Sequence, residues 1–221
     1  MEQTEPHRLK RRLLALLNAG DGRIFYTVSG AEAVENALKM ARLVTGRTKI
    51  LARAHSYHGA TLGALSVTGD WRGQEHFSVQ DQTLRIPEPD TLDALQKTRV
   101  LIEQHDPKTF AAFCLETIVA FNGILAPPQE WWTGIQKLAE EFAIPLILDE
   151  VSCGFGRMGQ DFAFQRYDLK PDFVCMAKAI SGGYVPLGAL FVTEKIARFW
   201  DSKVLNCGLT SYAHPLALAA A

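Results

Sequence analysis

Hydrophobic positions along the 221-residue chain follow two periods in turn. Short runs of β-branched, aromatic and aliphatic residues predict strands over residues 23–28, 49–52, 110–115, 145–148, 172–176 and 187–192. Apolar residues three or four positions apart predict helices over residues 6–18, 31–44, 91–103 and 130–142. Because helices and strands alternate, we expect a mainly parallel sheet covered by helices.

Two predicted helices indicate which of their sides is buried. In the helix over residues 31–44, the apolar stripe consists of Val34, Leu38 and Ala41. In the helix over residues 91–103, the expected core contacts are Leu92, Leu95, Val100 and Leu101.

The last seven residues, 215–221, have the pattern of an apolar helix that begins but has no polar stop. A domain seldom ends inside such a helix, because the last carbonyl groups would lack partners. We therefore expect a truncated chain that forms one large domain over residues 1–221, a length suited to a single domain.

Composition excludes several classes of function. The net charge is −1, so no basic surplus points to nucleic acid and no charge block points to a membrane surface. The apolar run at residues 13–17 is too short for a membrane span and lacks a cleavage region. Four cysteines form no Cys-x-x-Cys pair, which indicates free thiols in a reducing compartment. We expect a cytoplasmic protein, and no metal site is predicted.

A candidate phosphate site follows the first predicted strand. Ser29, Gly30 and Ala31 open a helix, where backbone N–H groups and the helix dipole favour an anion. Ser29 and Glu32 also have the spacing of a capping box, so helix capping alone is the competing interpretation.

A second cluster, Ser-Tyr-His-Gly at residues 56–59, follows the second predicted strand. The Tyr57 ring is suited to stack on a planar cofactor, and Gly59 allows the backbone to approach closely. Packing of Tyr57 and His58 against the sheet is an equally good interpretation.

Two charged residues follow later strands. Asp149 ends an apolar strand at the edge where open α/β sheets bind ligands, and a carboxylate there favours a protonated heterocyclic nitrogen. The alternative is that Asp149 and Glu150 are solvated acids. Lys178 lies in an apolar stretch where a charged amine is costly, which favours a nucleophilic role. Extension of the amine into solvent is the alternative.

Together, the clusters supply an anion site, a stacking ring, a carboxylate and an amine, each at or just beyond the end of a predicted strand. Pyridoxal 5′-phosphate (PLP) needs all four, because its ring nitrogen requires an acid and its aldehyde requires a lysine. We predict PLP as the cofactor and Lys178 as the Schiff-base lysine.

With these motifs in order, the sequence resembles the class III, fold type I aminotransferases. The matching segments are residues 25–33, 37–42, 56–59, 147–151, 154–159, 171–172, 177–178, 182–183 and 208–215. The resemblance implies the large PLP-binding domain of fold type I, a three-layer α/β/α arrangement. It also implies that an N-terminal segment and most of a C-terminal small domain are missing from the chain.

The resemblance implies the contacts of the cofactor. Ser29, Gly30 and Ala31 would hold its phosphate, Tyr57 would stack on one face of the ring, and Val151 would pack against the other.

It also implies the residues that act on the cofactor or support it. Asp149 would pair with the ring nitrogen, and Lys178 would form the Schiff base and then move a proton between the substrate and the C4′ atom. His58 would contact the cofactor, and Glu116 would lie behind it. Thr210 would reach the phosphate of the neighbouring subunit in a homodimer.

The resemblance also suggests substrates. Members that act on ornithine or γ-aminobutyrate carry an acidic gate residue shortly after the position of Glu116, whereas residues 119–123 contain no acid. This favours an amine or ω-amino acid donor and a keto acid acceptor such as pyruvate. An aminomutase, racemase or decarboxylase, a non-catalytic PLP-binding or interaction protein and an inactive fragment remain alternatives. A dinucleotide-binding domain is disfavoured, because no Gly-x-Gly-x-x-Gly follows the first strand.

Overall fold

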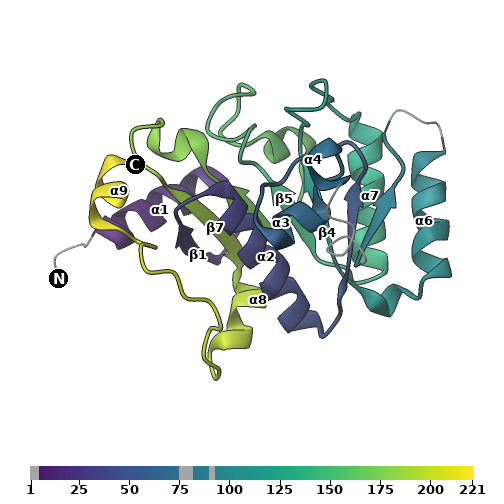
Figure 1. The fold of residues 1–221 in the computed structure, drawn as a ribbon, viewed down its shortest axis with the longest axis horizontal. Helices are drawn as coiled ribbons and strands as arrows, with labels where there is room; N and C mark the ends of the chain where they lie inside the picture. Colours follow the sequence, from purple (N-terminus) through teal and green to yellow (C-terminus); the bar gives the residue numbers. More distant parts are fainter. Residues whose placement is uncertain (1–4, 75–81, 90–92) are drawn as a thin grey trace.

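A computed structural model describes residues 5–74, 82–89 and 93–221 (Figure 1). Within them, seven strands form one sheet in the order β1-β7-β6-β5-β4-β2-β3. The strands are β1 (Gly22–Thr27), β2 (Lys49–Arg53), β3 (Thr83–Ile86), β4 (Phe110–Glu116), β5 (Leu146–Asp149), β6 (Phe173–Met176) and β7 (Gly188–Thr193). The α-helices are α1 (Glu5–Leu17), α2 (Gly30–Thr45), α3 (Leu62–Val67), α4 (Trp71–Gln74), α6 (Ala94–Gln104), α7 (Gln129–Glu141), α8 (Glu194–Ala197) and α9 (Pro215–Ala220). Short 3₁₀ turns are η1 (Pro107–Thr109), η2 (Ala163–Tyr167), η3 (Lys178–Ser181) and η4 (Arg198–Trp200).

The direction of the strands decides where their ends meet. β7 runs antiparallel to both of its neighbours, β1 and β6, and every other pair in the sheet is parallel. β1 therefore points the same way as β6, so β7 alone is reversed. The carboxyl ends of the six other strands lie at one edge of the sheet, which is where open α/β sheets bind ligands.

Helices cover both faces of the sheet and bury its alternating side chains. In β4, Phe113 and Leu115 belong to a core cluster shared with α1, α6, α7 and α9. Ala112 and Cys114 belong to a second cluster shared with α2, α3 and α8. Alternation within one fully buried strand thus separates the two helical layers. The expected mainly parallel, three-layer α/β/α fold is confirmed.

The predicted strands and helices are all present. Their ends shift by at most one residue, except at the start of α6, where the predicted residues 91–92 lie outside the described residues. α2 ends where expected, because Gly46 adopts a left-handed conformation with φ of 69°. The apolar pattern at residues 215–221 forms α9.

The expected burial of Val100 is wrong, since this residue of α6 is 38% exposed. The buried residues of α6 are Ala94, Thr98 and Ile102. These lie four positions apart and form one stripe, which excludes Val100. Leu95 and Leu101 flank the stripe and pack against the core as predicted, and Leu92 lies outside the described residues.

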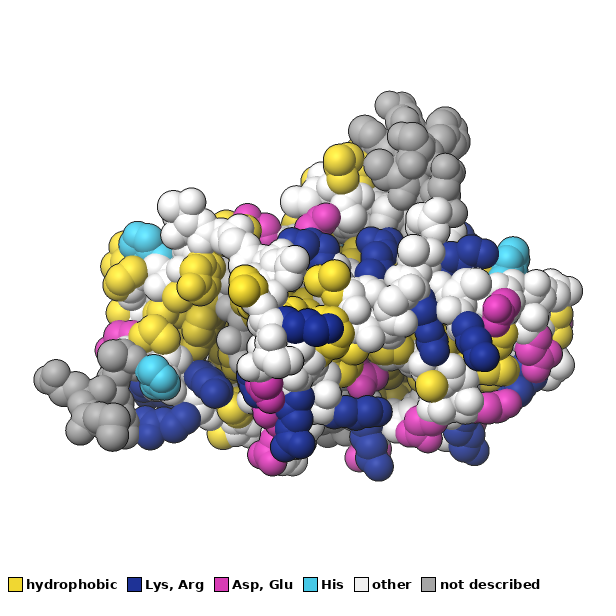
Figure 2. Space-filling view, turned by 90° about the horizontal axis from the view of Figure 1, so that it is seen from below, with side chains coloured by type: hydrophobic (Ala, Val, Ile, Leu, Met, Phe, Trp, Pro, Cys, Tyr) yellow, Lys and Arg dark blue, Asp and Glu magenta, His cyan; other side chains and the backbone are white. Residues whose placement is uncertain are grey.

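The surface and the thiols agree with the composition. Basic and acidic side chains are interspersed across the face shown in Figure 2. All four cysteines are free, and Cys114, Cys153 and Cys175 are buried. Within residues 5–74, 82–89 and 93–221, no helix has the length and hydrophobicity needed to cross a bilayer. The same residues contain no group of three or more potential metal ligands.

Candidate active site

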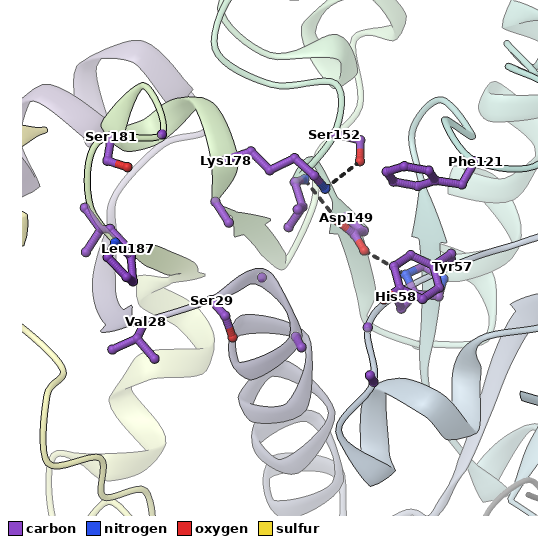
Figure 3. A pocket seen from close by; sticks show the side chains of 18 of the residues that line it. Val28, Ser29, Tyr57, His58, Phe121, Asp149, Ser152, Lys178, Ser181 and Leu187 are labelled. Atoms are coloured by element: carbon purple, nitrogen blue, oxygen red, sulfur yellow. Dashed lines mark hydrogen bonds and ion pairs between the residues drawn. The ribbon is translucent and has the colours of Figure 1, made fainter. Parts of the chain in front are cut away.

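A cavity of about 490 Å³ opens at the carboxyl edge of the sheet (Figure 3). Ser29, Gly30 and Ala31 reach it from the start of α2, and Tyr57 and His58 reach it from the loop after β2. Segments that are far apart in the sequence therefore line one space.

The other side of the cavity is formed by residues that follow β5 and β6. Asp149 and Val151 line it at the end of β5, and Lys178 lines it at the start of η3. The amine and the carboxylate expected to flank a single ring thus face the same cavity. The volume lies within the range of small-molecule sites.

The start of α2 is capped by side chains. The backbone N–H of Glu32 donates to Ser29 Oγ at 3.2 Å, as the predicted capping box requires. The Glu32 carboxylate, however, accepts from the N–H of Val28 at 2.9 Å instead of from Ser29. The N–H groups of Gly30 and Ala31 belong to the first turn, which has no intrahelical acceptors for them.

Gly30 is in tight contact with the loop after β5. A Cβ atom at this position would lie 2.8 Å from both γ-carbons of Val151. The absence of a side chain therefore lets the first turn of α2 approach Val151, and the two residues line the cavity together.

Replacing Gly30 by Ala is expected to destabilise the fold by about 1–3 kcal/mol, because the new methyl group overlaps Val151. This cost exceeds the ~0.5–1 kcal/mol that Ala gains over Gly in a helix. Urea unfolding would measure it. The Val151→Ala substitution should recover part of the loss in the Gly30→Ala background, and Gly208→Ala, where a Cβ meets open space, is the control. Parent-like stability of Gly30→Ala would refute the packing argument.

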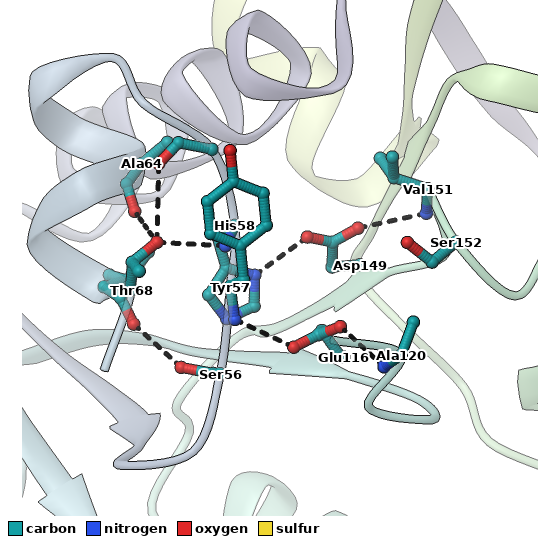
Figure 4. A network of polar contacts seen from close by, with 12 residues as sticks. Ser56, Tyr57, His58, Ala64, Thr68, Glu116, Ala120, Asp149, Val151 and Ser152 are labelled. Atoms are coloured by element: carbon teal, nitrogen blue, oxygen red, sulfur yellow. Dashed lines mark hydrogen bonds and ion pairs between the residues drawn. The ribbon is translucent and has the colours of Figure 1, made fainter. Parts of the chain in front are cut away.

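Asp149 is buried at the end of β5, with 4% of its surface exposed. Its Oδ2 lies 2.8 Å from Nδ1 of His58, and its Oδ1 accepts from the N–H of Val151 at 3.0 Å (Figure 4). The interpretation of Asp149 and Glu150 as solvated acids is therefore wrong. A carboxylate oxygen has two lone pairs, so Asp149 retains acceptor capacity toward the cavity.

Glu150 has a different environment from its neighbour and does not line the cavity. Its carboxylate accepts from the Thr117 hydroxyl at 2.6 Å and from the backbone N–H groups of Ala163 and Phe164 at 2.9 and 2.8 Å. Burial raises the pKa of Glu150. Glu150 therefore holds the start of η2 in place, whereas Asp149 lines the cavity.

Glu116 lies behind the cavity and holds two loops. Its Oε1 accepts from the N–H of Tyr57 at 3.0 Å, and its Oε2 accepts from the N–H of Ala120 at 3.3 Å (Figure 4). Burial raises the pKa of Glu116, while these N–H donors oppose the rise. The side chain does not line the cavity, so its contact with a ligand would be indirect.

The Tyr57 ring is held by contacts on two sides. The Arg72 guanidinium lies 4.6 Å from its centroid, and Phe121 packs against it edge-to-face with a centroid distance of 5.7 Å. Tyr57 and Phe121 line the cavity, whereas Arg72 does not. The ring is therefore fixed in place at the wall of the cavity.

Lys178 has a left-handed backbone with φ of 48°. This conformation costs a residue with a side chain about 1–2 kcal/mol, so the surrounding structure must enforce it. Lys178 Nζ donates to Ser152 Oγ at 3.0 Å. The side chain is exposed to the open cavity and not enclosed as the apolar sequence context suggested. Partial burial of the amine still lowers the pKa of Lys178, and the carboxylates of Asp149 and Glu116 oppose this.

The lining of the cavity differs from the predicted set of site residues. Ser152 and Phe121 line the cavity but were not predicted as site residues. Ser152 follows Asp149 by three positions, a signal of proximity that does not reveal where its hydroxyl points. Thr210 is exposed and lies outside the cavity of its own chain, so its proposed role in a neighbouring subunit stays a prediction.

The sequence and the fold are similar to those of known proteins. The sequence model of the family described as aminotransferase class-III matches residues 1–221. The acetylornithine aminotransferase of Methanopyrus kandleri is 37% identical over 218 residues, which cover 98% of this chain and 53% of that protein. The hypotaurine/taurine–pyruvate aminotransferase of Paracoccus denitrificans is 33% identical over 198 residues, which cover 80% of this chain and 42% of that protein.

A solved structure agrees with the sequence comparisons. The taurine:2-oxoglutarate aminotransferase of Bifidobacterium kashiwanohense, in complex with PLP and glutamate, superposes with a TM-score of 0.92 and 36% identity. The match covers 100% of this chain and 53% of that chain. The chain spans about half the length of the curated relatives it matches, with shares of 47% and 53% for the first two.

Proposed function

We propose that this chain, which belongs to the class III aminotransferases, forms the PLP-binding large domain of an enzyme that moves an amino group from a donor amine to a keto acid. The observation that carries the proposal is the shared cavity, where the Lys178 amine, the Asp149 carboxylate and the first turn of α2 all face one space. Class III aminotransferases depend on PLP, and the similar taurine:2-oxoglutarate aminotransferase contains it.

The chemistry of these residues fits PLP. An amine suits an aldehyde, a buried carboxylate suits a ring nitrogen that carries a proton, and a helix N-terminus suits a phosphate. The lack of a side chain at Gly30 brings the first turn of α2 close to Val151, because the space between them does not admit even a methyl group.

The cofactor would be held from three sides. Ser29 and the N–H groups of Gly30 and Ala31 would hold the phosphate. Tyr57 would stack on one face of the ring, and Val151 would pack against the other. Tyr57 suits this role because Arg72 and Phe121 already fix its ring at the cavity wall.

Asp149 and Lys178 would act on the reacting atoms. When bound, PLP supplies an aldehyde for the substrate amine and a ring that delocalises the electron pair of the substrate carbon. Asp149 would keep the ring nitrogen protonated, and its own position is fixed by His58 and the Val151 N–H. Lys178 would attach to the aldehyde and later carry the proton that leaves the substrate carbon. The lowered pKa of Lys178 increases the fraction of neutral amine available for both tasks.

Supporting roles belong to residues around this centre. His58 would touch the cofactor and hold Asp149, and Glu116 would act indirectly through Tyr57. Thr210 is exposed in its own chain, so we assign it to the phosphate site of a second copy in a homodimer. We place the protein in the cytoplasm, because its free and mostly buried thiols suit a reducing compartment.

We propose an amine or ω-amino acid as donor and a keto acid such as pyruvate as acceptor. Two similar proteins bear names with related substrates, a hypotaurine/taurine–pyruvate aminotransferase and a taurine:2-oxoglutarate aminotransferase. The cavity offers a neutral aromatic side chain, Phe121, beside the amine of Lys178. This apolar wall suits the carbon skeleton of an amine donor.

Titration of the full-length protein with PLP, followed by a panel of amines and ω-amino acids, would test the proposal. We expect a new absorbance band with one cofactor per chain, and its replacement by the band of the amine form when a donor is added. Pyruvate should then restore the first band and yield alanine. Racemised substrate, released CO₂ or an isomerised amino acid would favour the other reactions of this cofactor. A cofactor band that no donor alters would indicate a non-catalytic PLP-binding protein.

A further inference from the structure

The Lys178 amine rests against two residues that have no place in the proposed cofactor contacts. Its Nζ donates to Ser152 Oγ at 3.0 Å and lies 5.1 Å from the ring centroid of Phe121 (Figure 3). Ser152 comes from the loop after β5, and Phe121 comes from the loop after β4. Two separate strand ends therefore meet at one amine.

Both partners favour the protonated amine. The Ser152 hydroxyl accepts an N–H, and a hydrogen bond to a charged donor is stronger than one to a neutral donor. An aromatic face attracts a cation within this range of distance. Both contacts thus oppose the desolvation that lowers the pKa of Lys178.

Other charges around the amine belong to the same balance. The carboxylates of Asp149 and Glu116 favour the ammonium form, whereas the Arg157 guanidinium disfavours it. Within the described residues, however, only Ser152 makes a direct hydrogen bond with Nζ.

The two partners are held in position by the rest of the site. Phe121 packs edge-to-face on Tyr57 at 5.7 Å, and the residue before it donates its N–H to Glu116 at 3.3 Å. Ser152 follows Val151, whose N–H is bound to Asp149 at 3.0 Å. The hydroxyl and the ring are therefore presented to the amine by elements that do not depend on Lys178.

We propose that Ser152 and Phe121 form a receiving site for the Lys178 amine, which holds the amine whenever it is not attached to the cofactor. The inference rests on the proposed function, because only a lysine that is attached and then displaced needs such a place. Ser152 and Phe121 act through Lys178 and are positioning residues. By retaining the displaced amine near Asp149 and setting its proton affinity, they keep it available for the transfer of a proton.

The test measures how fast PLP attaches to Lys178 at different pH values in the full-length protein. Borohydride reduction at timed intervals, followed by mass analysis of the Lys178 peptide, gives a rate for this lysine alone. Only the neutral amine attacks an aldehyde, so the rate rises with pH and levels off at the pKa of the free amine.

The informative variants are Ser152→Ala and Phe121→Leu. Ser152→Thr and Phe121→Tyr retain the hydroxyl and the ring, and Ser66→Ala is a control whose hydroxyl bonds to Gly63 at 2.6 Å.

Loss of either partner makes the ammonium form less favourable, so the levelling point should move to lower pH. We expect a shift of about one pH unit for Ser152→Ala, the size of a hydrogen bond to a charged group. Loss of the ring face should shift it by about half a unit. In Ser152→Thr, Phe121→Tyr and Ser66→Ala, the rate should level off at the same pH as in the parent protein.

An unchanged or higher levelling point in either Ser152→Ala or Phe121→Leu overturns the receiving site, provided that PLP attaches to Lys178. A shift of the same size in Ser66→Ala would also overturn it, since that change touches no atom of the amine. If PLP attaches to another lysine, or to none, in the parent protein, the proposed function itself fails. The two failures are therefore distinguished by the mass of one peptide.

Discussion

Replacing Lys178 by Ala should abolish the covalent attachment of PLP and reduce amino-group transfer by at least about 10³-fold, because one amine both attaches the cofactor and moves the proton. Absorbance after addition of PLP and borohydride-stable labelling of the peptide would measure the first loss. Single-turnover reaction with a donor amine would measure the second.

The matched control is Lys203→Ala, which removes an exposed lysine whose amine lies 4.0 Å from the Phe199 ring. This variant should keep both attachment and transfer. Lys178→Arg keeps the positive charge and should be as inactive as Lys178→Ala, since a guanidinium is not a nucleophile at neutral pH. Labelling at the parent level in Lys178→Ala would place the reactive lysine elsewhere.

Replacing Asp149 by Asn should leave PLP bound but slow the proton-transfer step by about 10²–10³-fold, the size of a preorganised electrostatic contribution. The amide has the shape of the carboxylate but no charge, so the ring nitrogen would lose the anion that favours its proton. A donor deuterated at the reacting carbon should show a larger isotope effect in this variant, because proton transfer becomes the slow step.

The control for this substitution is Asp161→Asn, which alters an exposed acid outside the cavity. Retention of PLP in Asp149→Asn should be checked by its absorbance band, so that a slow reaction is not confused with an empty site. Turnover close to that of the parent, with PLP bound, would remove Asp149 from the chemistry.

Most of the fold follows from local patterns in the sequence. The strand ending at Asp149 and the helix opening at Gly30 have strong periodicity and clear ends, and both are found where expected. β3 at the edge of the sheet escaped prediction because it spans only four residues, Thr83–Ile86, so the alternation of polar and apolar residues is too short to stand out. The six-residue α3 is also too short for periodicity to reveal. Strand order and the reversal of β7 depend on long-range packing, which no local pattern contains.

The candidate site also contains residues that the sequence predicts and residues whose place depends on long-range packing. Ser29, Asp149 and Lys178 lie at or just beyond the ends of strands, and they carry a signal because strand ends predict a common edge of the sheet. Phe121 carries none, since its contact with Lys178 depends on a loop that packs on Tyr57. The burial of Glu150, with its three oxygen and nitrogen donors, was equally invisible, because two of them come from η2, more than ten residues away.

The reversed strand β7 ends at the edge of the sheet opposite the cavity, and this suggests where a label could be attached. Because it runs opposite to the rest of the sheet, it delivers the chain to the rim farthest from the cavity, where Glu194 donates its N–H to Asp21 at 2.9 Å beside the start of β1. A surface linker attached near this rim would leave the cavity facing the solution. We therefore expect a dye or a solid support attached near Glu194 to lie at the opposite end of the sheet from the cavity.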